Sequence, residues 1–178
     1  MPVVVNLVGS PNARSRSRAL AVAVVDELLA AGALAGVDRQ MVDLAEIAGV
    51  TFTEEPAVGC APVDDPVGRV CAAQLLIVAT PTYKGAYSGL LKTFLDQLHR
   101  DAPLSGVVAA GIITAHSAQH HQATAHALTA LLHELGATVA TPHLLVLDQD
   151  DLAAAAAQWA TLHGPALSHA LRTELCPA

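Results

Sequence analysis

Residues 9–18, GSPNARSRSR, place three serines and three arginines in ten positions directly after the apolar run Val3–Val8. Serine hydroxyls donate hydrogen bonds, and an arginine can bind a phosphate through two parallel N–H groups. If a helix starts here, its first N–H groups and its positive dipole end also favour a phosphate. Three readings follow: an anionic group on a small ligand, a nucleic-acid backbone, or a serine-capped turn with solvated arginines.

The chain lacks other phosphate-binding motifs, and this reduces the number of candidate ligands. The chain has no G-x-G-x-x-G after its first apolar run and no G-x-x-x-x-G-K-[ST], which excludes the dinucleotide fingerprint and the P-loop. Asn6 and Leu7 stand where a phosphorylatable receiver domain would carry acidic residues. A monophosphate held by a serine-rich loop remains, and flavin mononucleotide (FMN) is the ligand that this predicts.

A second stretch with chemical potential is ATPTYKGAYSGLLKTFLDQL, residues 79–98. Its pattern predicts a strand over Leu75–Thr80, a loop over Pro81–Tyr87, and a helix that Ser88 caps. The loop holds Tyr83 and Tyr87, two of the chain's five aromatic residues. Because glycine permits close backbone approach, such a loop could lie along the edge of an isoalloxazine ring. Tyr83 would then pack near the ring or support the loop, and the sequence leaves both open.

Composition bounds the class of protein. The chain has 178 residues, 53% of them hydrophobic, which suits one domain with a sizeable core over residues 1–178. Its net charge of −7 argues against nucleic-acid binding. It contains no uninterrupted run of about 18 apolar residues, and its start lacks the pattern of a secretory signal, so we expect no membrane span. The three cysteines (Cys60, Cys71 and Cys176) are widely spaced, which favours neither a disulfide framework nor a zinc site and suits the cytoplasm.

The two stretches must be positioned by alternating strands and helices. Five apolar runs predict buried strands: Val3–Val8, Arg39–Leu44, Leu75–Thr80, Val107–Thr114 and Thr138–Leu147. Four segments have helical spacing: Ser15–Ala31, Ser88–His99, Ala118–Leu135 and Asp151–Leu171. A long connection, residues 45–70, leads into a short helix near 66–73. This alternation predicts an α/β domain, a doubly wound three-layer structure with a five-stranded parallel sheet. Ligands of such domains bind at the carboxyl ends of the strands, where both stretches would lie.

Four histidines cluster in the chain at positions 116, 120, 121 and 126. A zinc site needs a third ligand, which no H-E-x-x-H pattern or cysteine pair supplies. We therefore expect solvated histidines on a helix face and no metal.

Taken together, GSP-x-x-x-SRS and ATP-x-YK-x-x-YSGLLK-x-FLD resemble the NADPH-dependent FMN reductase family, which has the flavodoxin-like fold. The similarity is greatest to the flavin reductases of alkanesulfonate utilisation and extends from Pro2 to about Leu171. The resemblance implies FMN contacts in three segments. The phosphate would be held by Ser10, Ser15, Arg16 and Ser17, the ring would be lined by Pro81, Thr82, Tyr83 and Lys84, and the other side of the flavin would be closed by the loop of Thr114, His116 and Ser117.

The resemblance also implies an activity, which is transfer of hydride from NADPH or NADH to FMN. Reduced flavin would then be supplied to a partner, a two-component monooxygenase being the expected one, by a homodimer or homotetramer. The runner-up is a reductase with bound FMN that acts on quinones, azo compounds or metal oxyanions. An electron carrier of flavodoxin type ranks below both, because the chain lacks a T/S-x-T-G-x-T loop. Relatives commonly have an arginine directly after GSP, where this chain has Asn12.

Overall fold

The computed structural model describes residues 1–51, 65–98, 101 and 103–175, and the structural statements below concern these residues. The strands are β1 (Val3–Val8), β2 (Asp38–Asp43), β3 (Leu75–Tyr83), β4 (Ala86–Tyr87), β5 (Val108–Ala115), β6 (Thr138–Val139) and β7 (Leu144–Leu147). The helices are α1 (Arg16–Ala30), α2 (Leu44–Thr51), α3 (Pro66–Cys71), α4 (Gly89–Leu95), α5 (Ala118–Glu134) and α6 (Leu152–Leu175).

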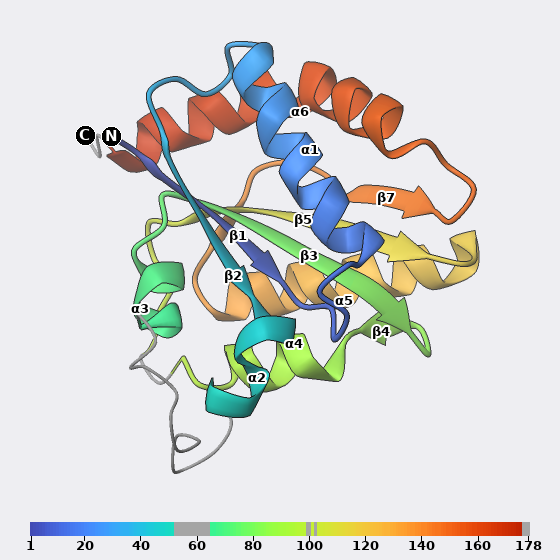
Figure 1. The fold of residues 1–178 in the computed structure, drawn as a ribbon. Coiled ribbons are helices and arrows are strands. Elements are labelled where there is room, and N and C mark those ends of the chain that lie inside the picture. Colours follow the sequence, from blue (N-terminus) through green and yellow to red (C-terminus); the bar gives the residue numbers. More distant parts are fainter. Residues whose placement is uncertain (52–64, 99–100, 102, 176–178) are drawn as a thin grey trace.

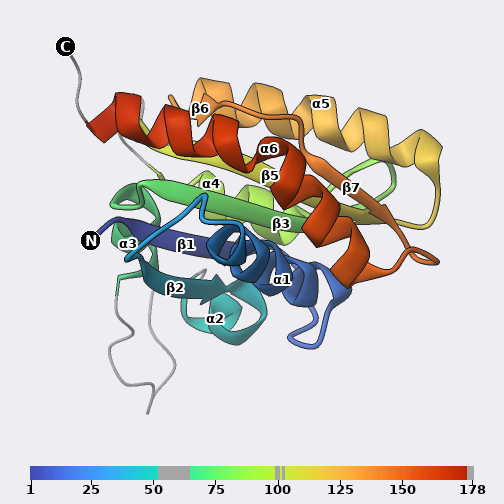
Figure 2. The same ribbon diagram turned by 90° about the horizontal axis from the view of Figure 1, so that it is seen from above.

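The strands form one mainly parallel sheet in the order β2-β1-β3-β5-β6, and β7 also pairs with β5. Helices α1 and α6 cover one face, and α3, α4 and α5 cover the other, which gives the three predicted layers (Figures 1 and 2). The α/β doubly wound prediction is confirmed. The predicted count of five strands is wrong, because the described chain has seven.

Both extra strands have local causes. The segment predicted as one strand over 138–147 splits into β6 and β7, which pair with successive parts of β5. Between them Pro142 has no N–H to give to a ladder, and the ring of His143 enters the gap. His143 Nδ1 accepts the N–H of Gly111 at 3.0 Å, so a side chain replaces a backbone partner there. Gly111 is needed, since a Cβ at that position would lie 2.8 Å from the His143 Cγ.

The second extra strand lies in the segment predicted as a loop over Pro81–Tyr87. Instead, β3 continues to Tyr83 and returns as the antiparallel β4. Lys84 and Gly85 form the turn with φ of 52° and 81°. Two positive φ values are what a type I′ hairpin turn requires, so the Lys-Gly pair converts the loop into a hairpin.

The long connection contains the expected short helix as α3 and one further helix, α2. Asp43, the last residue of β2, accepts the N–H of Ala45 at 3.0 Å and so caps the start of α2. A carboxylate at this position is a regular N-terminal signal of a helix. Residues 52–64 of the predicted connection lie outside the described residues.

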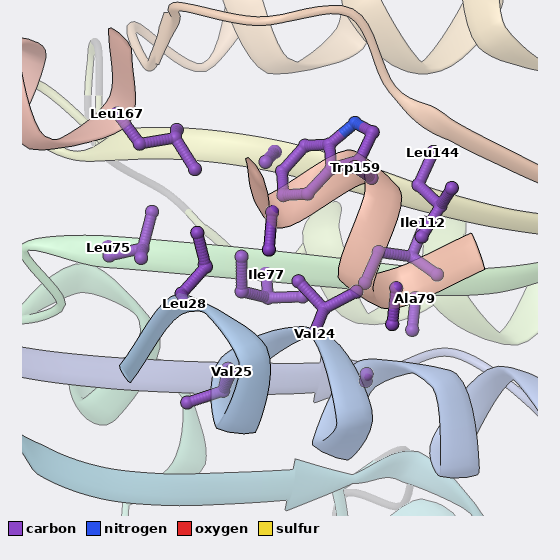
Figure 3. Packing of buried hydrophobic residues seen from close by; sticks show 14 of the residues in the cluster. Val24, Val25, Leu28, Leu75, Ile77, Ala79, Ile112, Leu144, Trp159 and Leu167 are labelled. Carbon is purple, nitrogen blue, oxygen red and sulfur yellow. The ribbon is translucent and has the colours of Figure 1, made fainter. Parts of the chain in front are cut away.

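The core lies on both faces of the sheet, because alternate residues of each buried strand point to opposite sides. On one face, residues of β3 and β5 pack against α1 and against Trp159 and Leu167 of α6 (Figure 3). On the other, Phe94 and Leu128 are fully buried against the sheet from α4 and α5. Within the described part of the chain, no helix is long and apolar enough to cross a membrane.

Candidate functional site

The candidate site is the edge of the sheet where the parallel strands end. From β1 the chain crosses to β2 on one side and then to β3 on the other, so the connections separate at the β1/β3 boundary. A crevice forms at such a switch point in doubly wound sheets, and ligands bind there. The loop after β1 and the β3–β4 hairpin, which carry the two sequence motifs, both lie at this edge (Figure 1).

The first motif forms a compact loop that ends in the start of α1. Ser10 Oγ accepts the N–H of Asn12 at 3.1 Å, and Asn12 Oδ1 accepts the N–H of Arg14 at 2.9 Å. Ser15 caps the helix, since its Oγ accepts the N–H of Arg18 at 3.2 Å. The N–H groups of the first helical residues, 16 and 17, have no partner within the helix and can donate to a ligand. The predicted anion site therefore has the geometry of a capped helix N-terminus.

A buried serine joins the two motifs. Ser88 Oγ donates to the carbonyl of Gly9 and accepts the N–H of Leu91 at 3.0 Å, while its own N–H donates to Thr80 Oγ1 at 3.0 Å. Gly9 lies so close to α4 that a Cβ there would be 2.6 Å from the Leu91 Cβ. The sequence predicted Ser88 as a helix cap. It gave no indication of the bond to Gly9, because nothing local marks a contact across 79 residues.

The hairpin carries the four residues predicted to line a flavin ring. Pro81 lies opposite Thr114 in the β3–β5 register. Thr82 Oγ1 donates to Thr124 Oγ1 at 3.3 Å, which ties the hairpin to α5. Tyr83 is 49% exposed, and Lys84 is exposed on the turn. The structure thus brings these residues to the edge that the first motif occupies.

The third predicted segment follows β5. Thr114 is buried, and its hydroxyl lies 2.8 Å from that of the buried Ser17, which joins the start of α1 to the end of β5. His116 is exposed, and its Nδ1 contacts the carboxylate of Asp148 in the turn after β7. Ser117 stands at the N-cap of α5 without a side-chain capping bond, so its hydroxyl is open to a ligand.

The arginines of the first motif have different environments. Arg16 Nη2 donates to the carbonyls of Leu147 and Asp150 at 3.2 and 3.0 Å. Arg18 Nε donates to Asp43 Oδ2 at 3.0 Å. Burial raises the pKa of Asp43, although the neighbouring Arg18 opposes that shift. Neither the turn after β7 nor Asp43 was predicted to contact the motif, because both contacts depend on tertiary structure.

One histidine differs from expectation. His121 is buried, and its Nε2 lies 3.0 Å from the carbonyl of Val146, whereas it was predicted to be solvated. The inward face of α5 places it against β7. His116, His120 and His126 are exposed, as expected. Over the described residues, no group of three histidine, cysteine or acidic side chains could hold a metal ion.

The donor set of this edge fits FMN. Backbone N–H groups 16 and 17, with the hydroxyls of Ser10 and Ser15 nearby, suit a phosphate, and the hairpin offers backbone and aromatic surface to a ring. A hollow of about 500 Å³ lies elsewhere, between α3 and the end of α4. None of the residues predicted to contact FMN lines it, so volume alone does not locate the site.

The strand order is β2-β1-β3-β5, followed by the position that β6 and β7 share, and the connections separate at the β1/β3 switch point. This order, with a ligand edge at that switch point, defines the class of flavodoxin-like proteins. Residues 2–151 match the model of the family described as NADPH-dependent FMN reductase, and the chain therefore belongs to that family. This match confirms the family that the two motifs predicted. It is a family of NAD(P)H:flavin oxidoreductases that use FMN and NADPH.

Individual relatives agree with this assignment. An FMN reductase (NADPH) of Escherichia coli K12 is 43% identical over 79 residues, which is 42% of this chain and 41% of that protein. The apo form of an NADH:FMN oxidoreductase superposes with a TM-score of 0.74 at 26% identity, covering 97% of this chain and 90% of that one. An oxidoreductase from Corynebacterium diphtheriae has a TM-score of 0.79 at 22% identity over 97% of both chains, which supports the fold alone.

Proposed function

We propose that this protein is an NAD(P)H-dependent FMN reductase, a single-domain enzyme that passes reduced flavin to a partner, a two-component monooxygenase. One observation carries the proposal: the Ser88–Gly9 hydrogen bond holds the two motifs together at one edge of the sheet. Family membership, and an E. coli relative named for this reaction with NADPH, support it. We also propose that the protein works in the cytoplasm, which suits its few, widely spaced cysteines.

In this proposal the protein binds and orients, and bound FMN supplies the hydride acceptor. The start of α1 holds the phosphate through backbone N–H groups 16 and 17, assisted by the hydroxyls of Ser10 and Ser15. The hairpin residues Pro81, Thr82, Tyr83 and Lys84 line the ring. Lys84 and the N–H groups of its turn place positive charge beside it, which favours added electron density. Thr114, His116 and Ser117 border the other side.

The competing candidate has the same site but retains FMN and reduces quinones, azo compounds or metal oxyanions. The open edge favours exchange of the flavin, since its phosphate contacts come from one loop. We further propose a homodimer or homotetramer. Tyr83 is a large aromatic residue left 49% exposed beside the site, and a second chain would cover it.

Desalting distinguishes the two enzymes. After expression and gel filtration we expect a multimer with little bound flavin, whose NADPH oxidation depends on added FMN and yields free reduced flavin that reacts with oxygen. A quinone or metal oxyanion added to the same preparation should be reduced no faster than free FMN. Stoichiometric FMN after gel filtration, together with faster reduction of those acceptors, would establish the bound-FMN reductase instead.

A further inference from the structure

The first motif carries three arginines, and the family resemblance assigned only Arg16 to the FMN phosphate. The chain has nine lysines and arginines and a net charge of −7. A phosphate that approaches this negatively charged protein is therefore attracted by any positively charged side chain near its binding site. Three of these nine stand at positions 14, 16 and 18, within five residues at the start of α1. Their side chains cannot all serve the same ligand if some already have protein partners.

The side chains of Arg16 and Arg18 already bind other parts of the protein. Both hydrogen bonds of Arg16 Nη2 go to carbonyls of the turn after β7, at Leu147 and Asp150. That turn is already closed by Asp150, whose carboxylate accepts the N–H of Leu147 at 2.7 Å. Arg18 is paired with the buried carboxylate of Asp43, on the side of α1 that faces β2 and α2. Each of these guanidinium groups therefore joins α1 to another part of the fold.

Arg14 is different. Its side chain is exposed and makes no hydrogen bond or ion pair within the residues that the structure describes. Its backbone, by contrast, is fixed, because its N–H donates to Asn12 Oδ1 and the Ser15 N–H donates to the carbonyl of Asn12 at 3.1 Å. The loop thus presents Arg14 beside the free N–H groups at the start of α1 without using its charge for folding.

We infer that Arg14 is the cationic side-chain ligand of the FMN phosphate, and that the side chain of Arg16 is a structural tie to the turn after β7. Arg16 would then meet the phosphate through its backbone N–H alone. This inference rests on the proposed function, since it concerns the same site. A phosphate monoester is also present on NADPH, and the test must separate that source from FMN.

Four variants test the division of roles: Arg14→Ala, Arg14→Lys, Arg16→Ala and, as a charge-matched control, Arg39→Ala, whose parent side chain pairs with Asp26 on the surface. Dissociation constants for FMN and riboflavin are measured by quenching of flavin fluorescence at two salt concentrations, and the thermal midpoint of each apo protein is recorded. Michaelis constants for NADPH and NADH complete the set.

We expect Arg14→Ala to weaken FMN about ten- to a hundredfold, to leave riboflavin within about twofold, and to reduce the salt dependence of FMN binding. Arg14→Lys should restore part of the loss, because it restores the charge. Arg16→Ala should lower the thermal midpoint and change FMN and riboflavin affinity by the same factor, whereas Arg14→Ala should leave the midpoint unchanged. Arg39→Ala should not alter the FMN/riboflavin ratio.

Three results would overturn the inference. One is a selective loss of FMN in Arg16→Ala but not in Arg14→Ala, and the second is no selective loss in either variant. The third is an Arg14→Ala protein whose Michaelis constant rises for NADPH and not for NADH while its FMN/riboflavin ratio is unchanged, which would assign Arg14 to the nicotinamide cofactor. In each of these cases the proposed function still holds if the wild-type protein binds FMN more tightly than riboflavin. Wild-type protein that binds neither flavin would remove the function itself.

Discussion

Replacing Gly9 with alanine will lower both the stability of the protein and its affinity for FMN. The new Cβ would lie 2.6 Å from the Cβ of Leu91, and both atoms are attached directly to backbone, so neither can rotate away. The loop after β1 and helix α4 must then separate, and Leu91 is fully buried. Overpacking of this kind costs about 1–3 kcal/mol. Because the same displacement strains the Ser88–Gly9 bond, we expect FMN affinity to fall about tenfold or more.

Gly89→Ala is the matched control for this change. Gly89 is the first residue of α4, and a Cβ there meets nothing within 4 Å. Alanine favours a helix over glycine by up to about 1 kcal/mol, so this variant should be as stable as the wild type or slightly more stable. Denaturant unfolding and FMN titration of both variants give the comparison. If Gly9→Ala unfolds and binds like Gly89→Ala, then the loop and α4 are not in the tight contact described here.

His143 makes the stability of the protein depend on pH in the acid range. Its Nδ1 accepts the Gly111 N–H, and its Nε2 lies 2.9 Å from Thr129 Oγ1, whose hydrogen goes to the carbonyl of Ala125. These partners require the neutral ring with the proton on Nε2. Burial, with a smaller contribution from the charge of His133, lowers the pKa of His143 from 6.5 to about 4.

The sign of the effect follows from the two protonation states. Above pH 6.5 the ring is neutral in both the folded and the unfolded chain. As pH falls from 6.5 to about 4, His143 becomes protonated in the unfolded chain but stays neutral in the folded chain. The free energy of unfolding therefore decreases. The stabilisation present at neutral pH is therefore lost as pH falls through the folded pKa. Its size is up to about 3 kcal/mol.

His143→Asn measures this contribution. The asparagine oxygen can still accept the Gly111 N–H, but the side chain does not titrate in this range. Urea unfolding at several pH values between 7 and 4 should show a stability loss for the wild type that is about 2–3 kcal/mol larger than the loss for the variant. Parallel stability curves would show that His143 is not the neutral buried group described here.

The sequence predicted the elements whose signals are local. The buried strand Val3–Val8 coincides with β1, and the N-cap at Ser88 was predicted from a hydroxyl residue before an apolar-periodic segment. Because parallel strands end at one edge, the meeting of the two motifs also followed from strand order alone. The loop after β1 and the segment 81–87 could therefore be assigned to one edge of the sheet before their contacts were known.

The features that sequence reasoning missed depend on partners far along the chain. The break between β6 and β7 depends on His143 reaching Gly111, and the burial of His121 depends on the carbonyl of Val146. The β3–β4 hairpin was missed for a different reason, since Lys84 adopts a φ of 52° that non-glycine residues seldom take. The partners of Arg16 and Arg18 likewise appear only when β7 and β2 are in place.

The most direct test of the central claim is an anaerobic mixture of purified protein, FMN and NADPH with no partner protein or other acceptor. We expect the concentrations of oxidised FMN and of NADPH, each followed by its absorbance, to fall together in a molar ratio of one to one, at a rate proportional to protein concentration. Riboflavin at the same concentration should be reduced more slowly, because it lacks the phosphate that the start of α1 is proposed to hold. No loss of either absorbance with NADPH or with NADH, from protein that binds FMN, would contradict the claim and leave a flavin-binding carrier in place of a reductase.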